Sequence, residues 1–340
     1  MNMDTQDLSL NLVVDLYGCP NRCLHCWLGH MPNRAMEKDA DQFIVDSFYP
    51  YFDRIAFYSW VREPDFCADY AARWERDKAI SKNALPERFE LASFWRIVRD
   101  GDYIPFLRSV GVKKVQLSFF GLAETQDRYV GRKGAFEEVC RASDLLIEGG
   151  IVPRWQGFIN EENRDELVEV LHLAQDVQRE KCPELEFFVH EGSCDGENRR
   201  LYPIRIQKSH IPEALLPYYL DYDKIMTEKE CCAALKSDGG HPSFPIGKNI
   251  TLNISNTYDV YYNFTHMTRP WVIGNLKTDD PDVLVRRILT GDTFALHKAQ
   301  TCTWAALSEA YGDPDSEKVF RLDDFKTWLF NAYLEDEEKC

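Results

Sequence analysis

Three cysteines lie close together near the start of the chain, in the segment Cys19-Pro20-Asn21-Arg22-Cys23-Leu24-His25-Cys26. Their CxxxCxxC spacing puts three thiols on one short loop, directly after the apolar run Leu8 to Leu16. Three thiolates can hold three irons of a 4Fe-4S cluster, and no fourth cysteine follows within that loop. Because electron-transfer clusters ordinarily have four cysteine ligands, the loop predicts a cluster whose fourth iron is open to another ligand.

A zinc site and a set of core thiols compete with a cluster as the role of the cysteine loop. A structural zinc site would need four ligands, usually as two close pairs well separated in sequence, and the remaining Cys and His residues show no second CxxC pair. Free cysteine is often buried in protein cores, but a loop of Pro, Asn and Arg gives core cysteines no reason to cluster. The iron-sulfur interpretation is therefore favoured.

The three-cysteine loop resembles that of the radical S-adenosylmethionine (radical SAM) superfamily. In that family the open iron binds the amino and carboxylate groups of the cofactor's methionine. One electron then cleaves the sulfonium to a 5'-deoxyadenosyl radical, which abstracts hydrogen from a substrate. The resemblance implies that Cys19, Cys23 and Cys26 ligate one 4Fe-4S cluster and that S-adenosylmethionine is the cofactor. It also implies an external one-electron reductase of the flavodoxin or ferredoxin type.

The resemblance implies that two further residues bind the cofactor. His25 fills the position before the third cysteine, where the family often has an aromatic residue near the adenine; a locally hydrogen-bonded loop histidine is the alternative. Val61-Arg62-Glu63-Pro64 stands in place of the family's Gly-Gly-Glu-Pro element, so Glu63 would accept a hydrogen bond from the methionine ammonium group. Here both glycines are replaced, and an exposed Glu-Pro helix start is the alternative for Glu63.

A second motif supplies further candidates for the cofactor site. The stretch from Val115 to Gly121, followed by Gln126 to Phe136, resembles a "QLSxxG" region of the radical SAM branch that carries SPASM or twitch C-terminal domains. In that branch a polar residue at the end of the strand contacts the ribose, which makes Ser118 the candidate. Arg154 and Gln156, on the next predicted strand, are expected to point toward the barrel mouth or its wall.

The elements that must position these residues alternate between strand-like and helix-like runs from Leu8 to about His190, as in repeated βα units. The strand-like runs are Leu8 to Leu16, Arg54 to Trp60, Arg88 to Trp95, Lys113 to Phe120, Ile151 to Ile159 and Leu185 to Val189. The helix-like runs are Asp39 to Phe48, Phe66 to Ala79, Tyr103 to Val110, Phe136 to Ile147 and Leu167 to Arg179. The resemblance implies an α/β fold, a partial (β/α)6 TIM-like barrel, whose chemistry belongs at the C-terminal ends of the strands. The cysteine loop follows the first strand.

The C-terminal part has a different pattern. A hairpin is predicted from Asn249 to Ser255 and Tyr258 to Asn263, followed by helices at Pro281 to Leu289 and Asp323 to Leu334. The hairpin resembles that of SPASM and twitch domains, but Asp259 stands at the position of a glycine and Asn263 at that of the auxiliary-cluster cysteine. Asparagine is not a soft iron ligand, so a single cluster is predicted.

Two domains are expected on this basis: a radical SAM core barrel over residues 8–205, and a smaller α+β SPASM/twitch-like extension over 206–340 with a degenerate cluster site. Five further cysteines, from both predicted domains, are interpreted as buried or surface thiols: Cys182, Cys194, Cys231, Cys232 and Cys302. Without its cluster, the hairpin region could place substrate contacts over the barrel mouth, from His266, Arg269 or Trp271.

The composition limits which classes of partner and which cellular compartment are expected. The 340 residues carry a net charge of −16, which disfavours a nonspecific grip on nucleic acid because phosphates need a Lys/Arg face. The N-terminus lacks a signal-peptide pattern, and no apolar run approaches the roughly 20 residues that span a bilayer. With eleven cysteines, an odd number, and no signal, reduced thiols are favoured over a disulfide scaffold. We expect a cytoplasmic protein with no membrane association.

These observations predict an enzyme that cleaves S-adenosylmethionine reductively and abstracts hydrogen from a small-molecule substrate, a metabolite or natural-product intermediate. Because the first strand begins near residue 8, no room is expected for a leader-peptide-binding domain. A peptide-modifying enzyme of ribosomal peptide maturation and a non-catalytic iron-sulfur redox or sensor protein are the alternatives. Whether the reaction is of the oxidoreductase, lyase or mutase type stays open.

Overall fold

The computed structural model describes residues 8–26, 28–29, 31–263 and 266–339 of the chain. In the first two hundred residues, strands alternate with helices, as the sequence predicts. The elements are β1 (Ser9–Val14), α1 (Ala40–Phe48), β2 (Arg54–Tyr58), α2 (Tyr70–Ile80), α3 (Phe94–Ile97), α4 (Tyr103–Ser109), β3 (Lys114–Phe119), α5 (Ala123–Val130), α6 (Ala135–Glu148), β4 (Val152–Phe158), α7 (Arg164–Glu180) and β5 (Glu186–His190).

The C-terminal part contains short strands, helices and several turns of 3-10 helix. Its regular elements are β6 (Met226–Thr227), α8 (Glu228–Leu235), β7 (Asn249–Ile254), β8 (Asp259–Tyr262), β9 (Gly274–Asn275), α9 (Pro281–Thr290), α10 (Phe294–Ala299), α11 (Trp304–Tyr311), β10 (Val319–Phe320) and α12 (Leu322–Lys339). The 3-10 turns are η1 (Gly196–Ile204), η2 (Lys208–His210), η3 (Glu213–Tyr218), η4 (Tyr222–Lys224) and η5 (Arg269–Trp271). The predicted hairpin and the two predicted C-terminal helices are all present.

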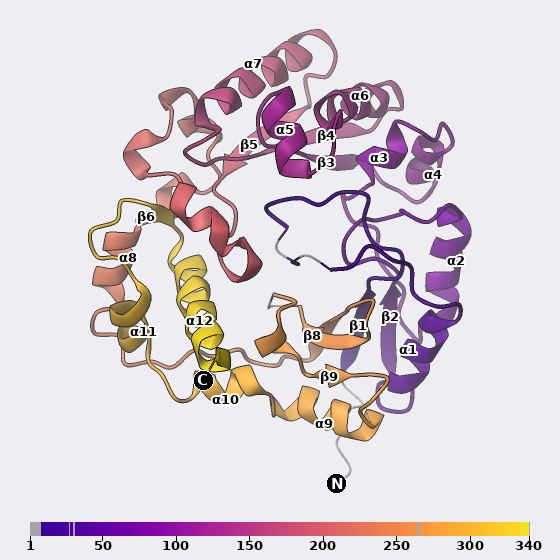
Figure 1. The fold of residues 1–340 in the computed structure, drawn as a ribbon. Coiled ribbons are helices and arrows are strands. Elements are labelled where there is room, and N and C mark those ends of the chain that lie inside the picture. The colour runs from indigo at the N-terminus through magenta and orange to yellow at the C-terminus, as the bar shows by residue number, and fades with distance from the viewer. Residues whose placement is uncertain (1–7, 27, 30, 264–265, 340) are drawn as a thin grey trace.

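The strands form two larger sheets. The first has the order β2-β1-β7-β8-β9, with β1 parallel to both β2 and β7 and the β7–β8 hairpin antiparallel. The second is a parallel sheet in the order β3-β4-β5, and β6 pairs with β10 in a small separate ribbon. Figure 1 shows the two larger sheets on opposite sides of the molecule, with the segment between β1 and α1 (indigo) lying between them. The mixed α/β architecture with parallel strands is confirmed, and the partial barrel stays a prediction.

The strands adjoining the molecule's centre have one apolar and one polar face. In β1, Leu10, Leu12 and Val14 are fully buried in a core shared with α1 and α9. In β3, the alternate residues Val115, Leu117 and Phe119 pack against α6. Since successive side chains of a strand point to opposite faces, the residues between them turn the other way. Burying each leucine contributes about 1.5–3 kcal/mol, which fixes the register and thereby aims the polar residues at the centre.

One predicted strand is wrong. Residues 88–95 form no strand. In the described part of the chain, one backbone hydrogen bond joins them to the second sheet, from Gln116 N to Glu90 O at 2.9 Å. Ser93 accepts a hydrogen bond from Arg96 N and caps α3, so the backbone turns into a helix at Phe94. Arg96 also donates to backbone carbonyls of residues 65–67, which holds this turn in place. The apolar run therefore covers the gap between β2 and β3 without joining either strand.

The C-terminal hairpin belongs to the same sheet as the first strand. Strand β7 pairs with β1 in register from Ser9–Asn249 to Val14–Ile254. The sheet therefore crosses the predicted boundary at residue 205, and the division into two domains stays a prediction. Among the described residues, no helix is both long enough and apolar enough to cross a bilayer.

Candidate functional site

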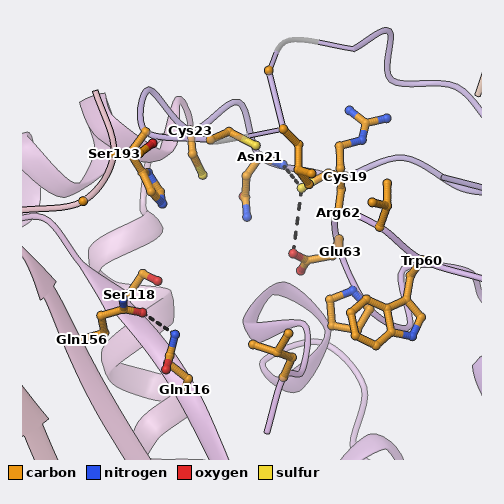
Figure 2. Close-up of a pocket in the computed structure, with 18 of the residues that line it drawn as sticks. Cys19, Asn21, Cys23, Trp60, Arg62, Glu63, Gln116, Ser118, Gln156 and Ser193 are labelled. Carbon is orange, nitrogen blue, oxygen red and sulfur yellow. Dashed lines mark hydrogen bonds between the residues drawn. The ribbon is translucent and has the colours of Figure 1, made fainter. Parts of the chain in front are cut away.

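A cavity of about 1190 Å³ lies between the two sheets. It is lined by all three cysteines of the N-terminal loop, by residues at the C-terminal ends of the parallel strands, and by the β7–β8 hairpin. Figure 2 shows Cys19, Arg62 and Glu63 on one side of this space and Gln116, Ser118 and Gln156 on the other. Small-molecule sites usually measure about 300–1,000 Å³, so the volume exceeds what one such ligand needs.

The cysteine loop is shaped by the turn that follows α5. Arg22 N donates to Val130 O at 2.9 Å and Leu24 N donates to Tyr129 O at 2.8 Å. Gly131 has a φ of 73°, and a Cβ atom there would lie 2.9 Å from the carbonyl oxygen of Arg22. A side chain would thus meet both backbone strain and a clash. The glycine after α5 allows the loop to approach this closely.

The three thiols of the loop are free and mostly shielded from water. Burial raises the pKa of Cys23 to about 12 and also raises the pKa of Cys19 and Cys26. Without a positive ion the thiols are therefore protonated, whereas metal coordination deprotonates a thiol outright. Within the described ranges, no three His, Cys, Asp or Glu side chains surround one point as ligands of a single ion. The cysteines of a 4Fe-4S cluster each bind a different iron, so three free thiols on one cavity wall fit that group.

Glu63 lies beside the cysteines. Its Oε2 is 3.9 Å from Cys19 Sγ, and its Oε1 is buried with no partner among the described residues (Figure 2). Burial raises the pKa of Glu63 to about 7, opposed by a hydrogen bond from Ser93 and by the charge of Arg132. Helix α2 begins only at Tyr70, so the helix-start alternative for Glu63 is wrong. The carboxyl group has an acceptor atom free for a ligand.

Arg62, which stands where the resemblance expects a glycine, ties the loop to the first sheet. Its Nε and Nη2 donate to the two carboxylate oxygens of Asp15 at 3.0 and 2.7 Å. Its Nη1 and Nη2 also donate to the carbonyls of Met31 and Pro32. Both charged side chains are buried, with 7% and 1% of their surfaces exposed. The sequence marked Arg62 as a departure from the family and gave no sign of this role.

His25 packs between aromatic rings on the opposite wall. Its ring centre lies 4.2 Å from that of Phe120 and 4.5 Å from that of Phe158. Burial, with a smaller contribution from His190, lowers the pKa of His25 to about 3, so the ring is neutral. Its Nδ1 is buried and has no hydrogen-bond partner in the described part of the chain. The ring thus forms part of an aromatic wall, and the locally hydrogen-bonded alternative is not observed.

Polar residues of the second sheet form another wall. Ser118 and Gln156 line the cavity, and Gln156 is hydrogen-bonded to both Gln116 and His190. Burial lowers the pKa of His190 to about 4. Arg154 was expected on this wall but is not among the lining residues. It donates to Gln116 Oε1 at 2.7 Å and pairs with Glu90 at 3.1 Å.

The C-terminal contacts expected at the mouth lie elsewhere. His266 pairs with Asp195 at 2.6 Å, Arg269 with Glu338 at 2.9 Å, and Trp271 donates to Asn331 at 2.7 Å. The C-terminal residues that do line the cavity are Thr251, Asn253, Asn263, Arg321 and Asp324. Asn263 was identified in the sequence only as a lost cluster ligand. The alternation of Thr251 and Asn253 with Ile250, Leu252 and Ile254 is the one sequence signal that could have placed this wall.

The five described cysteines from Cys182 onward do not line this cavity. Cys182, Cys194, Cys231 and Cys302 are buried, Cys232 is partly buried, and all are free thiols.

Comparisons with known proteins gave matches to solved structures only. No protein-family model and no curated protein match the chain. A structure of native anSMEcpe with bound AdoMet is 14% identical, with 97% of this chain and 99% of that chain covered and a TM-score of 0.49. A structure of Streptococcus suis SuiB bound to precursor peptide SuiA is 12% identical, with 84% of this chain and 66% of that chain covered and a TM-score of 0.47. These identities and TM-scores carry no function from those proteins to this chain.

Proposed function

We propose that this protein is a radical SAM enzyme. In this proposal Cys19, Cys23 and Cys26 hold one 4Fe-4S cluster, and the enzyme abstracts hydrogen from a small-molecule substrate, a metabolite or natural-product intermediate. The observation that carries it is that the three free thiols, the half-buried Glu63 and the polar strand ends line one cavity. The cavity volume of about 1190 Å³ supports two occupants, a cofactor and a substrate.

The residues that line the cavity fit the parts of the cofactor. Glu63 Oε1 would accept a hydrogen bond from the ammonium group of the cofactor's methionine. Ser118 and Gln156 would bind hydroxyl groups of the ribose, and His25 with its two phenylalanines would cover the adenine. When bound, cluster and cofactor would supply the 5'-deoxyadenosyl radical, and the protein's part is to position the substrate and exclude water.

The proposal includes one cluster and an external electron donor. Asn263 supplies no thiolate, and the ten described cysteines include no second loop of closely spaced ligands. A flavodoxin- or ferredoxin-type reductase would deliver the electron. Such a cluster and so many free thiols fit a reducing compartment, the cytoplasm.

A peptide-modifying reaction is the second candidate. It is favoured by the same surplus of volume and by an uncharged, hydrogen-bonding hairpin wall, which suits a peptide segment as well as a small molecule.

Iron content tests the cluster assignment. After anaerobic reconstitution we expect about four irons per chain. Replacing any one of Cys19, Cys23 or Cys26 with alanine should remove most of that iron, because two thiolates hold a cube poorly. The matched controls are Cys67→Ala and Cys140→Ala, since these partly buried cysteines do not line the cavity.

The same preparations test the reaction. With dithionite and S-adenosylmethionine, the wild type and both control variants should form 5'-deoxyadenosine, whereas the three loop variants should not. Unchanged iron in the Cys19/Cys23/Cys26 triple variant would show that these thiols are not the ligands. Iron near eight per chain would show a second cluster.

A further inference from the structure

The β7 strand presents an uncharged polar wall to the cavity. Ile250, Leu252 and Ile254 point into the core with α1 and α9, so the alternate residues Thr251 and Asn253 face the other way. Both line the cavity, as does Asn263 just after β8. This hairpin thus contributes only neutral side chains to the lining.

Asn253 is a polar residue whose burial is not explained by a hydrogen bond of its Nδ2 within the described residues. Only 3% of its surface is exposed, and its Nδ2 has no hydrogen-bond partner among the described residues. Its Nδ2 makes no hydrogen bond to either neighbour across the sheet, Val13 on β1 or Tyr261 on β8. A buried donor that is left unpaired costs stability, and native proteins rarely keep one without a function. The side chain therefore points to a ligand group that completes its hydrogen bonds.

The surroundings of Asn253 restrict the chemistry of that group. Thr251 Oγ1 accepts from Asn11 Nδ2 at 3.1 Å, which leaves its own proton available, and Asn263 N donates to Thr251 O at 3.1 Å. Of the three arginines that line the cavity, Arg62 is paired with Asp15, Arg321 is paired with Asp221 at 3.7 Å, and Arg22 is exposed to solvent. An ionised carboxylate or ammonium group against this wall would lack a counter-charge of the hairpin and lose hydration. A carboxamide side chain offers both donor and acceptor, which an amide of the ligand matches.

We propose that Asn253 is a specificity-determining residue that binds a neutral amide group of the substrate. The inference rests on the proposed function for identifying the cavity as the substrate site. The amide belongs either to a peptide backbone or to the carboxamide of a small molecule, and these two sources share the chemistry that the wall recognises.

Four matched probes test the proposal on the reconstituted full chain with S-adenosylmethionine. N-methylbutanamide represents a peptide bond, and butanamide a carboxamide. Methyl butanoate lacks the N–H group, and butanoate carries a charge. By ligand-observed NMR titration, the better amide should bind about threefold to tenfold more tightly than the ester or the carboxylate, as expected for one hydrogen bond. A preference for the secondary amide identifies a peptide, and a preference for the primary amide identifies a small molecule.

The variant Asn253→Leu separates recognition from structure. It should weaken amide binding threefold to tenfold, while its Tm without probes equals or exceeds that of the wild type, because the lost side chain has no protein partner. The control is Asn249→Leu, the same change at an exposed position of β7 outside the cavity, which should leave amide binding intact.

The proposal is overturned if neither amide binds, if the ester or butanoate binds as well as the amides, or if Asn253→Leu binds amides normally. A lower Tm for Asn253→Leu would show a structural role instead. Formation of 5'-deoxyadenosine without probes, measured on the wild type, distinguishes these failures from failure of the proposed function.

Discussion

At the scale of single residues, burial determines the protonation states of the side chains in the site. The histidines on the cavity wall are held neutral, and the thiols and Glu63 are held toward their protonated forms. In each case burial in a poorly hydrated wall disfavours the charged state. A bound cation, whether a metal or an ammonium group, would reverse this preference for the thiols and for Glu63. The wall with the thiols and Glu63 can therefore bind a positively charged group, and the wall with the histidines can bind a neutral ring.

This burial predicts an acid-sensitive stability. The pKa of His190 is about 4 in the folded protein and about 6.5 when unfolded. The unfolded state therefore binds a proton first as pH falls below about 6.5, and stability is lost down to about pH 4. Between pH 7 and pH 5, His190 should account for a loss of about 2 kcal/mol in the free energy of unfolding.

Urea unfolding of His190→Gln at the two pH values measures this contribution. The drop between pH 7 and pH 5 should be smaller than in the wild type by that amount. The exposed His172 on α7 provides the control, His172→Gln, which should behave as the wild type. Equal pH dependence of all three proteins would contradict the prediction.

The sequence located part of this site. Spacing marked the three cysteines, and the family resemblance marked Glu63 after the second strand and Ser118 at the end of a later one; all five line one cavity. His190 and Asn253 were not found, because their inward direction depends on strand register that local patterns do not specify. The expectation for Arg154 shows the same limit, since it shares a strand face with Gln156 but contacts Gln116 and Glu90 and does not line the cavity.

At the scale of elements, the loop after β1 is held by one guanidinium group. Arg62 contacts the end of β1 and the segment at residues 31–32, so it closes the loop that carries the cysteines. Replacing Arg62 with alanine would leave the buried Asp15 carboxylate without its partner. We expect a loss of about 3–5 kcal/mol in the free energy of unfolding and a lower yield of reconstituted iron.

Two further variants separate charge from geometry. Arg62→Lys should recover little, because an ammonium group cannot make the bidentate contact. The double variant Arg62→Ala/Asp15→Asn should be more stable than Arg62→Ala, since no buried charge is left unpaired. If Arg62→Ala unfolds in urea like the wild type, the loop is held by other contacts.

Helices and strands could be predicted from the sequence where their apolar residues recur with the periodicity of the element and are buried on one face. Helices α6 and α7 and strands β1 and β3 each bury one face, and all were expected from the sequence. The strand predicted at residues 88–95 was wrong because the apolar residues of this segment are partly exposed. Phe89 and Leu91 keep 46% and 39% of their surfaces exposed, and the segment covers a gap without pairing. Hydrophobicity alone does not reveal whether a partner strand exists.

At the scale of the whole molecule, β1 lies between strands from both predicted domains. A chain ending at residue 205 would expose the edge of β1 along six paired positions and remove α9 from its core. We expect this fragment to be unfolded or aggregated by circular dichroism and size-exclusion chromatography. Co-expression with residues 206–340 should restore a soluble complex. A monomeric, cooperatively folding 8–205 fragment would instead establish it as an independent domain.

The pairing of Ser9 with Asn249 also sets an order of events during synthesis. At about 5–20 residues per second, the ribosome needs roughly 10–50 seconds to add the 240 residues between them. The cysteine loop gains contacts from Asn198 and Arg200 only late in that interval. If the loop holds a cluster as proposed, its three thiols stay without these contacts while most of the chain is made, and they must be kept reduced during that time.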